Sequence, residues 1–286
     1  MLNDFYQMLN PVAFSLGPIS VRWYGIAYVL GFALAAFMLV RTSRRWHVRF
    51  NSDSLLTIMI CVIFGVIIGA RLGYVLFYGF DYYAAHPLEV FVLSNGGMSF
   101  HGGLLGALAA GIVAAKLTGI PYLTLADMGA IAAPIGLFFG RCANFVNGEL
   151  WGAVTSLPIG VVFGGAAGNV ARHPSQLYEA FLEGIVLFCI LYLLSRKKPP
   201  MPRGTHLGVF LIFYGMFRFL IEFVRQPDVQ LGYLWAGWLT MGQLLSVPLI
   251  VVGICLLVFA LKKKLPQTGL PNDKLEGSNE HSETVG

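Results

Sequence analysis

The chain has 286 residues, of which 57% are hydrophobic and only 12% are charged, and its mean hydropathy is +0.72. This composition excludes an ordinary water-soluble domain and indicates an integral membrane protein. The net charge of +5 agrees with basic loops that meet anionic lipid headgroups, so it gives no reason to expect nucleic acid as a partner.

Residues 1–19 precede the first apolar run. They contain Asp4 but no lysine or arginine, which argues against a cleavable signal peptide. Their scattered aromatic and aliphatic side chains predict an interfacial N-terminal arm on the outer surface of the membrane. An unstructured leader is the alternative.

Seven apolar runs of about 20 residues follow, the length that crosses a hydrocarbon core of about 30 Å. The runs are continuous, which predicts helices and not the short alternating strands of a membrane barrel. We therefore expect an all-α polytopic membrane protein, with helices 1–4 in residues 20–143 and helices 5–7 in residues 176–264. The predicted helices lie near 20–40, 55–78, 98–118, 123–143, 176–195, 207–224 and 242–261.

Two segments are not expected in the membrane. Residues 144–175 contain Pro158 and Pro174 and are too polar to span, so they predict a small extracytoplasmic cap. Residues 265–286 are polar and predict a disordered cytoplasmic tail. The four cysteines fall in or at the end of spans without a Cys-x-x-Cys pair, which argues against a disulfide framework or a zinc site.

Basic residues mark every second loop, and short cytoplasmic loops collect lysine and arginine. They follow the first, third, fifth and seventh runs: Arg41, Arg44, Arg45 and Arg49; Lys116; Arg196, Lys197, Lys198 and Arg203; Lys262, Lys263 and Lys264. The N-terminus is therefore predicted outside and the C-terminus inside the cell.

On this topology the polar residues of the spans share one depth, toward the outer leaflet. They are Tyr24, Arg71, Tyr74, His101, Arg141, Asn144, Arg218 and Glu222. Ionisable groups at membrane depth are expensive to keep and are functional candidates by default. Unrelated structural ion pairs would scatter between the two leaflets, so one outer-leaflet site is the favoured interpretation.

Several of these residues also have a structural interpretation. Arg218 and Glu222 are four residues apart on a helix and can form a structural ion pair. Arg71 can extend to the outer headgroups. His101 can be a hydrogen-bonded core residue, but Gly102, Gly103 and Gly106 beside it permit close backbone approach, which favours a functional role. The row Gly65, Gly69 and Gly73 predicts helix packing.

Five sequence elements together resemble the bacterial prolipoprotein diacylglyceryl transferases, over roughly residues 10–262. They are Trp23-Tyr24-Gly25, His101-Gly102-Gly103, the Gly-Arg-x-x-Asn-Phe-x-Asn-Gly-Glu-x-x-Gly pattern of residues 140–152, the segment 173–179 that reads His-Pro-Ser-Gln-Leu-Tyr-Glu, and the segment from Tyr214 to Asp228.

The resemblance implies transfer of a diacylglyceryl group from phosphatidylglycerol to the lipobox cysteine of a preprolipoprotein, with release of glycerol phosphate, at the outer face of the bacterial inner membrane. Arg141 and Arg218 are the candidates for holding the donor phosphate, because a guanidinium binds phosphate bidentately and stays charged. His101 is the candidate base for the acceptor thiol. Tyr24 or a carboxylate is the alternative base.

The remaining candidates would bind or orient the donor lipid. They are Tyr24, Asn144, Glu149, Gly152, Tyr214 and Glu222. No cofactor is implied, and no metal site is expected because histidine, cysteine and carboxylate residues at ligand spacing are absent.

Three other function classes fit these residues less well than a lipid transferase. A transporter would carry polar residues near the midplane and internal repeats. An intramembrane protease would need a serine–histidine or paired-aspartate site, and Asp127 is the one aspartate placed in a span. A scaffold protein would have no reason to gather arginine, glutamate and histidine at one depth.

Overall fold

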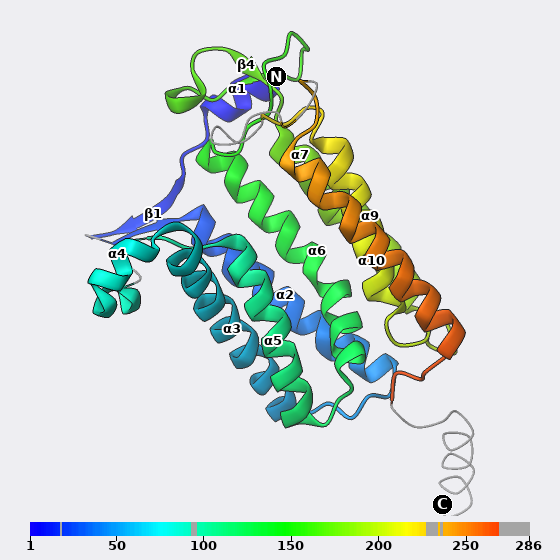
Figure 1. Ribbon diagram of the computed structural model, residues 1–286. Helices are drawn as coiled ribbons and strands as arrows, with labels where there is room; N and C mark the ends of the chain where they lie inside the picture. Colours follow the sequence, from blue (N-terminus) through cyan, green and yellow to red (C-terminus); the bar gives the residue numbers. More distant parts are fainter. Residues whose placement is uncertain (18, 93–95, 227–233, 235–236, 269–286) are drawn as a thin grey trace, which may run out of the picture. The chain divides into compact units, whose positions relative to one another are not determined.

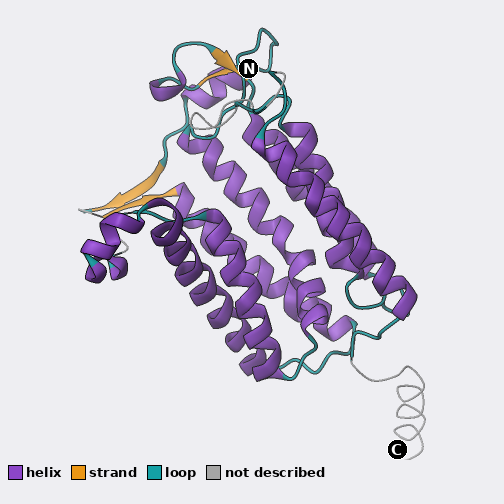
Figure 2. Cartoon of the chain, in the orientation of Figure 1, coloured by secondary structure: helices purple, strands orange, loops and turns teal. Residues whose placement is uncertain are grey.

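A computed structural model of the chain describes residues 1–17, 19–92, 96–226, 234 and 237–268. Within these residues the chain is mostly helical, and the paired strands form two short hairpins (Figure 2). Five helical segments are long and apolar enough to cross a membrane, and two shorter apolar helices accompany them. All seven predicted runs are helical, and an all-α polytopic membrane protein is confirmed.

The long segments are α2 (Trp23–Arg45), α3 (Ser52–Tyr78), α6 (Tyr122–Asn147), the composite segment Ser175–Ser195, and α10 (Met241–Lys263). The shorter helices are α5 (Phe100–Thr118) and α9 (Thr205–Ile221) (Figure 1). The composite segment consists of α7 (Ser175–Glu179), a π-helical stretch η4 (Ala180–Val186) and α8 (Leu187–Ser195).

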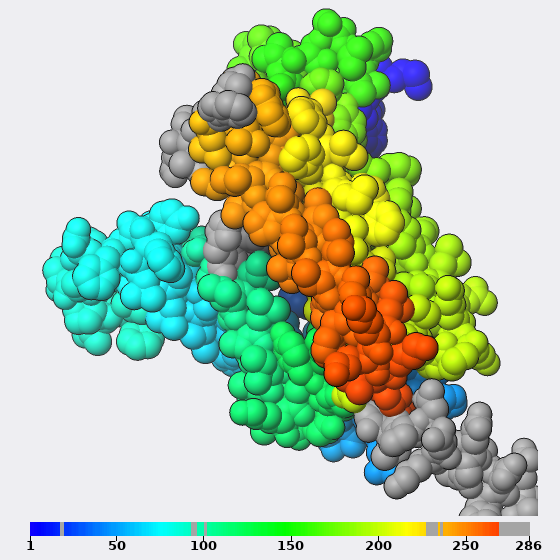
Figure 3. Space-filling view, turned by 45° about the vertical axis from the view of Figure 1, so that its right-hand side comes forward, coloured from blue at the N-terminus to red at the C-terminus, as the bar shows by residue number. Residues whose placement is uncertain are grey.

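The chain forms two compact units, and each is described by itself. The first comprises residues 1–42 and 127–266, and the second comprises residues 43–126 together with the residues from 267 on. In the first unit α9 and α10 run side by side (Figures 1 and 3). Their backbones meet at glycines: a Cβ on Gly253 would lie 2.8 Å from the Gly208 carbonyl oxygen. Small residues at such a crossing let two membrane helices pack closely.

The two ends of this helix pair are capped. Thr240 and Gln243 form a reciprocal capping box at the start of α10. At the start of α9 the caps come from another helix, because both carboxylate oxygens of Asp127 on α6 accept backbone hydrogen bonds, from Gly204 at 2.7 Å and from Leu207 at 2.8 Å. Asp127 is fully buried, so this contact fixes α9 against α6.

In the second unit α3 and α5 pack along the predicted glycine row. A Cβ on Gly65 would lie 2.6 Å from the Gly106 carbonyl oxygen, and a Cβ on Gly69 would lie 2.7 Å from the Gly106 Cα. The packing interpretation of the row is therefore confirmed. The same contact accounts for Gly102 and Gly106 on α5, which the sequence had linked to the function of His101.

Two short helices, α4 (Phe80–Ala85) and η1 (Pro87–Phe91), connect α3 to α5. Arg71 of α3 is only 4% exposed, and it donates hydrogen bonds to backbone carbonyls of this connection. The alternative in which Arg71 extends to the outer headgroups is therefore wrong, since a buried guanidinium with protein acceptors has no need of lipid.

The N-terminal residues form α1 (Leu2–Gln7) and a hairpin of β1 (Val12–Leu16) and β2 (Ile19–Arg22). The region after α6 contains β3 (Val161–Val162), η3 (Gly165–Ala167) and β4 (Ala171–Arg172). Helix α1 packs against this region: Gln7 Nε2 donates to the Val162 carbonyl at 2.8 Å, and Val162 donates to Asn3 at 2.9 Å. Whether α1 also lies on the membrane surface stays a prediction.

Packed structure continues past α10. Arg203 donates its backbone N–H to the Leu265 carbonyl at 2.9 Å, and Thr124 donates to the Gln267 carbonyl at 2.8 Å. Gln267 is buried, so the predicted disordered tail cannot begin at Leu265. Residues 269–286 lie outside the described residues.

Candidate functional site

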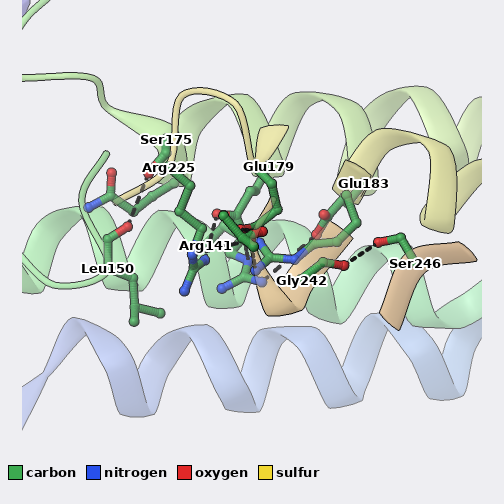
Figure 4. A network of polar contacts seen from close by, with 12 residues as sticks. Arg141, Leu150, Ser175, Glu179, Glu183, Arg225, Gly242 and Ser246 are labelled. Atoms are coloured by element: carbon green, nitrogen blue, oxygen red, sulfur yellow. Dashed lines mark hydrogen bonds and ion pairs between the residues drawn. The ribbon is translucent and has the colours of Figure 1, made fainter. Parts of the chain in front are cut away.

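Glu179 is the centre of a cluster of arginine and glutamate side chains in the first unit (Figure 4). Its Oε2 lies 2.6 Å from Nε of Arg141 on α6. Its Oε1 lies 3.0 Å from Nη1 of Arg225 and 3.6 Å from Nη1 of Arg218 on α9. One carboxylate at the end of α7 therefore holds three guanidinium groups together.

Glu222, just after α9, is the second carboxylate. It pairs with Arg218, lies 3.7 Å from Nε of Arg225, and accepts a hydrogen bond from Thr240 Oγ1 at 2.6 Å. A Cβ on Gly242 would lie 2.5 Å from the Glu222 Cδ, so the carboxylate needs a glycine there. The predicted Arg218–Glu222 pair is present, and it belongs to a network and does not stand alone.

Glu183 is the third carboxylate and lies within η4. Its Oε2 is 3.9 Å from Nη2 of Arg141. Gly184 brings η4 close to α6, since a Cβ there would lie 2.7 Å from the Phe138 Cβ. Single π-helical turns inside α-helices are frequent at functional sites, and this one brings Glu183 and Glu179 to the same arginine.

The exposure of the cluster is uneven. Glu179 and Glu183 are 0% exposed, whereas the side chains of Arg141 and Arg218 remain 18% and 17% exposed. An anion that approaches the cluster therefore meets guanidinium edges and not carboxylates. Arginine offers a planar fork of donors that matches a phosphate, so the arrangement is chemically suited to a phosphate-bearing ligand.

Asn144 and Glu149 face each other across the turn that ends α6. Asn144 Nδ2 donates to Glu149 Oε1 at 2.9 Å, and Asn147 Nδ2 donates to the same oxygen at 3.3 Å. Gly148 has a φ of +69°, which favours glycine in this turn. The spacing of Asn144, Asn147 and Glu149 in the motif therefore lets the three side chains close a hydrogen-bonded turn.

The same turn anchors α7. Gln176 Nε2 donates to the Glu149 carbonyl at 2.6 Å. Ser175 Oγ donates to the Leu150 carbonyl at 3.1 Å, as Figure 4 shows. Both Ser175 and Gln176 are fully buried. The motif at residues 140–152 and the motif at residues 173–179 therefore form one structure, which positions Glu179.

Gly152 has backbone contacts on both sides. Its N–H donates to the His173 carbonyl at 2.9 Å, and a Cβ would lie 2.5 Å from the Val224 carbonyl oxygen. Gly152 also pairs with Arg225 in a bridge, where the Ala153 N–H donates to the Val224 carbonyl at 2.9 Å, and this holds Arg225 near Glu179. Burial lowers the pKa of His173, whose Nδ1 lies 3.2 Å from the Tyr178 hydroxyl.

The two candidate tyrosines also lie in the first unit. The Tyr24 hydroxyl is 3.2 Å from the Tyr28 hydroxyl and interacts with Asn144. Tyr214 lies one turn before Arg218 on α9 and interacts with it electrostatically. Both tyrosines thus neighbour residues of the cluster or of the closed turn.

His101 belongs to the second unit, in the first turn of α5. Its side chain lies outside the described residues, and its role stays a prediction. Within the described part of the chain, no three histidine, cysteine or acidic side chains are arranged to hold a metal ion.

Three residues of the cluster were missing from the sequence-based site. Glu179 and Glu183 lie four residues apart inside an apolar run. Because charge inside a membrane is costly, these two glutamates are themselves a sequence signal for a functional site. Arg225 follows the predicted helix near 207–224, so the sequence alone indicates an ordinary charged loop residue. The structure brings Arg225 into the cluster through its contacts with Glu179 and Glu222 and its bridge to Gly152.

Comparison with known proteins gives a consistent result. The family model described as prolipoprotein diacylglyceryl transferase matches residues 11–259. Three relatives bear the name phosphatidylglycerol–prolipoprotein diacylglyceryl transferase. That of Geobacter sulfurreducens is 49% identical over 91% of this chain and 98% of its own length, that of Oleidesulfovibrio alaskensis 50% over 91% and 96%, and that of Solidesulfovibrio magneticus 51% over 88% and 95%.

Proposed function

The chain belongs to the prolipoprotein diacylglyceryl transferase family, and we propose that it transfers the diacylglyceryl group of phosphatidylglycerol to the lipobox cysteine of a preprolipoprotein signal peptide. In this reaction a sulfur–carbon bond forms, the carbon–oxygen bond to the phosphate breaks, and the thiol proton is removed. The products are a thioether-linked lipid and glycerol phosphate. The observation that carries the proposal is the arginine cluster, together with the family match over nearly the whole chain.

Arg141 and Arg218 hold the donor phosphate in this proposal. The reaction needs positive charge at the phosphate, because negative charge builds on the departing oxygen as the bond breaks. Glu179 supports the assignment, since it lies behind both guanidinium groups and restrains them before the donor arrives. Donors that are already oriented need no rearrangement in the transition state.

His101 takes the proton of the acceptor thiol. A cysteine thiol has a pKa of about 8.5 and reacts as the thiolate, and histidine is the side chain whose ordinary pKa best suits removal of that proton near neutral pH. This assignment rests on the sequence motif His101-Gly102-Gly103.

The remaining candidates orient the donor headgroup. Asn144 and Glu149 present polar atoms from a closed turn, which suits recognition of the glycerol hydroxyls. Tyr24 and Tyr214 offer phenol groups for hydrogen bonds. Glu222 orients Arg218, and Gly152 contributes by holding the segment after α9 in place.

The proposed location is the bacterial inner membrane, with the bilayer as the immediate environment and the site toward the outer leaflet. The alternation of basic and non-basic loops supports this orientation. A donor lipid and a signal peptide inserted in the same membrane can then both reach the site without entering water.

The test is a transfer reaction with the purified protein, labelled phosphatidylglycerol and a lipobox peptide. The peptide should gain the mass of one diacylglyceryl group while labelled glycerol phosphate is released in equal amount. A peptide with serine in place of cysteine is the matched control and should remain unmodified. Absence of product with the cysteine peptide, from folded protein, would reject the proposed function.

A further inference from the structure

Arg71 has every one of its N–H donors bound to the backbone of the segment between α3 and α5. Its Nε donates to the Val90 carbonyl at 2.7 Å. Its Nη1 donates to the carbonyls of Gly96 at 2.6 Å and Gly97 at 3.2 Å. Its Nη2 donates to the carbonyls of Glu89 at 2.6 Å and Val92 at 3.0 Å.

These five bonds exhaust the donors of a guanidinium. The side chain is also buried, and its Cζ lies 4.9 Å from the centre of the Tyr83 ring. Arg71 therefore has no donor left for a phosphate, which separates it from Arg141 and Arg218. Hydrogen bonds from a charged donor are about twice as strong as neutral ones, so this residue fixes a loop and does not bind the donor lipid.

The loop that Arg71 fixes leads directly into α5. Gly97 has a φ of +81°, and a Cβ there would lie 3.1 Å from Nη1 of Arg71. Two residues later, the Ser99 N–H donates to the Ala70 carbonyl at 2.8 Å, and the Ser99 hydroxyl caps α5 by accepting from Gly102 at 3.3 Å. Ala70 and Arg71, two consecutive residues of α3, thus hold residues 96–99, which lie just before His101.

We propose that Arg71 is a positioning residue that sets the place of His101 by fixing residues 96–99 onto α3. The proposal rests on the base role of His101 proposed above. The physical reason is geometric: a base must lie within hydrogen-bond reach of the proton that it removes, and a displacement of about 1 Å can slow a reaction by about 100-fold.

The experiment is a double-mutant cycle between Arg71→Lys and His101→Ala. Lysine keeps the positive charge but offers only three donors and no planar fork, so several carbonyls lose their partner and the loop shifts. Arg71→Lys should lower kcat at least about tenfold, while the KM for phosphatidylglycerol stays within about twofold. In the His101→Ala background, Arg71→Lys should have almost no further effect, because residues that act as one unit are not additive.

Arg172→Lys is the matched control, because Arg172 also donates to backbone carbonyls, those of Ala167 at 2.8 Å and Gly152 at 3.3 Å, but in the first unit. Its effect should be equal in the parent and in His101→Ala. The cycle is run near pH 7, where most of the peptide thiol is protonated and transfer depends on the base.

Each outcome decides the matter. If Arg71→Lys slows His101→Ala by the same factor as it slows the parent, or raises the KM for phosphatidylglycerol with unchanged kcat, the positioning role is wrong. If His101→Ala transfers at the parent rate, the base role of His101 and the positioning role of Arg71 are both wrong. If the parent itself transfers nothing, the proposed function has failed instead. Should Arg71→Lys not fold, Ser99→Ala, which removes only the cap of α5, must show the same non-additivity with His101→Ala.

Discussion

The carboxylates of the cluster are buried while its arginines stay partly accessible, and this contrast gives each residue a different expected phenotype. Glu179 contacts three guanidinium groups and no solvent. Arg141 and Arg218 each keep an accessible edge. A change at Glu179 should therefore mainly lower the stability of the fold. A change at Arg141 or Arg218 should mainly weaken binding of the donor lipid.

Glu179→Gln should lower the free energy of unfolding by about 3–5 kcal/mol, the usual effect of removing one partner from a buried ion pair. The amide removes the counter-charge that the three guanidinium groups share and leaves them only the contacts with Glu222 and Glu183. Thermal or denaturant unfolding of the purified protein in detergent measures this. Asp4→Asn is the control, because Asp4 is 80% exposed in its ion pair with the N-terminus, and its stability should match the parent. Equal stability of Glu179→Gln and Asp4→Asn would contradict the structural role of Glu179.

His101→Ala should slow transfer near neutral pH while leaving phosphatidylglycerol binding nearly intact, because the base acts on the acceptor. The defect should shrink as the pH rises above about 8.5, where the peptide thiol ionises without help. Transfer rates of variant and parent between pH 7 and pH 10 provide the measurement. A defect that stays constant with pH, together with lost lipid binding, would make His101 a headgroup ligand, and Tyr24 would become the candidate base.

The packing of the helices explains which residue contacts could be predicted from the sequence and which could not. The run that contains Gly65, Gly69 and Gly73 predicts a close contact, and α5 provides it. The pattern of apolar runs does not reveal a π-helical stretch, because the extra residue of η4 changes which side chains share a face without changing the composition. The contact of Glu183 with Arg141 could not be predicted for this reason. The loop carbonyls around Arg71 could not be predicted because they come from an irregular backbone.

Gly106→Ala should destabilise the second unit by about 1–3 kcal/mol, the effect of overpacking a close contact. The new Cβ would collide with Gly65 and lie 3.0 Å from the Gly69 Cα, both of which are backbone and cannot move aside cheaply. Gly103→Ala on the same helix is the matched control, since its Cβ would meet Ala70 at an ordinary 3.4 Å. Unfolding of the two variants should differ clearly, and equal stabilities would refute the tight α3–α5 contact.

For the molecule as a whole, the apolar pattern was sufficient to predict the seven long or apolar helices of the described residues. Length and hydropathy are strong constraints in a bilayer, because each spanning segment must satisfy its own backbone. Arg141 and Arg218 were also predictable, since charge inside an apolar run is conspicuous. The supporting residues of the cluster depend on contacts distant in sequence, such as the bridge between Gly152 and Arg225, and one sequence does not reveal these.

The predicted topology can be tested in intact cells with cysteines introduced one at a time. A cysteine within residues 197–203 should resist a membrane-impermeant thiol reagent, because the basic loop is expected inside. A cysteine within residues 154–168 should react. The parent, whose four cysteines lie in apolar helices, gives the background. The reverse labelling pattern would invert the topology and move the site to the cytoplasmic leaflet.

Whether the arginine cluster holds the donor phosphate is tested most directly by the binding and turnover of phosphatidylglycerol by Arg141→Lys. Lysine retains the positive charge but loses the planar fork, so the variant should remain folded and lose about 10²- to 10³-fold in transfer, the usual effect of removing one donor to a developing negative charge. Phosphatidylglycerol should also bind more weakly at every pH. The phosphate-binding role of Arg141 would be contradicted if the variant melts at the parent temperature and its transfer and lipid binding stay close to those of the parent.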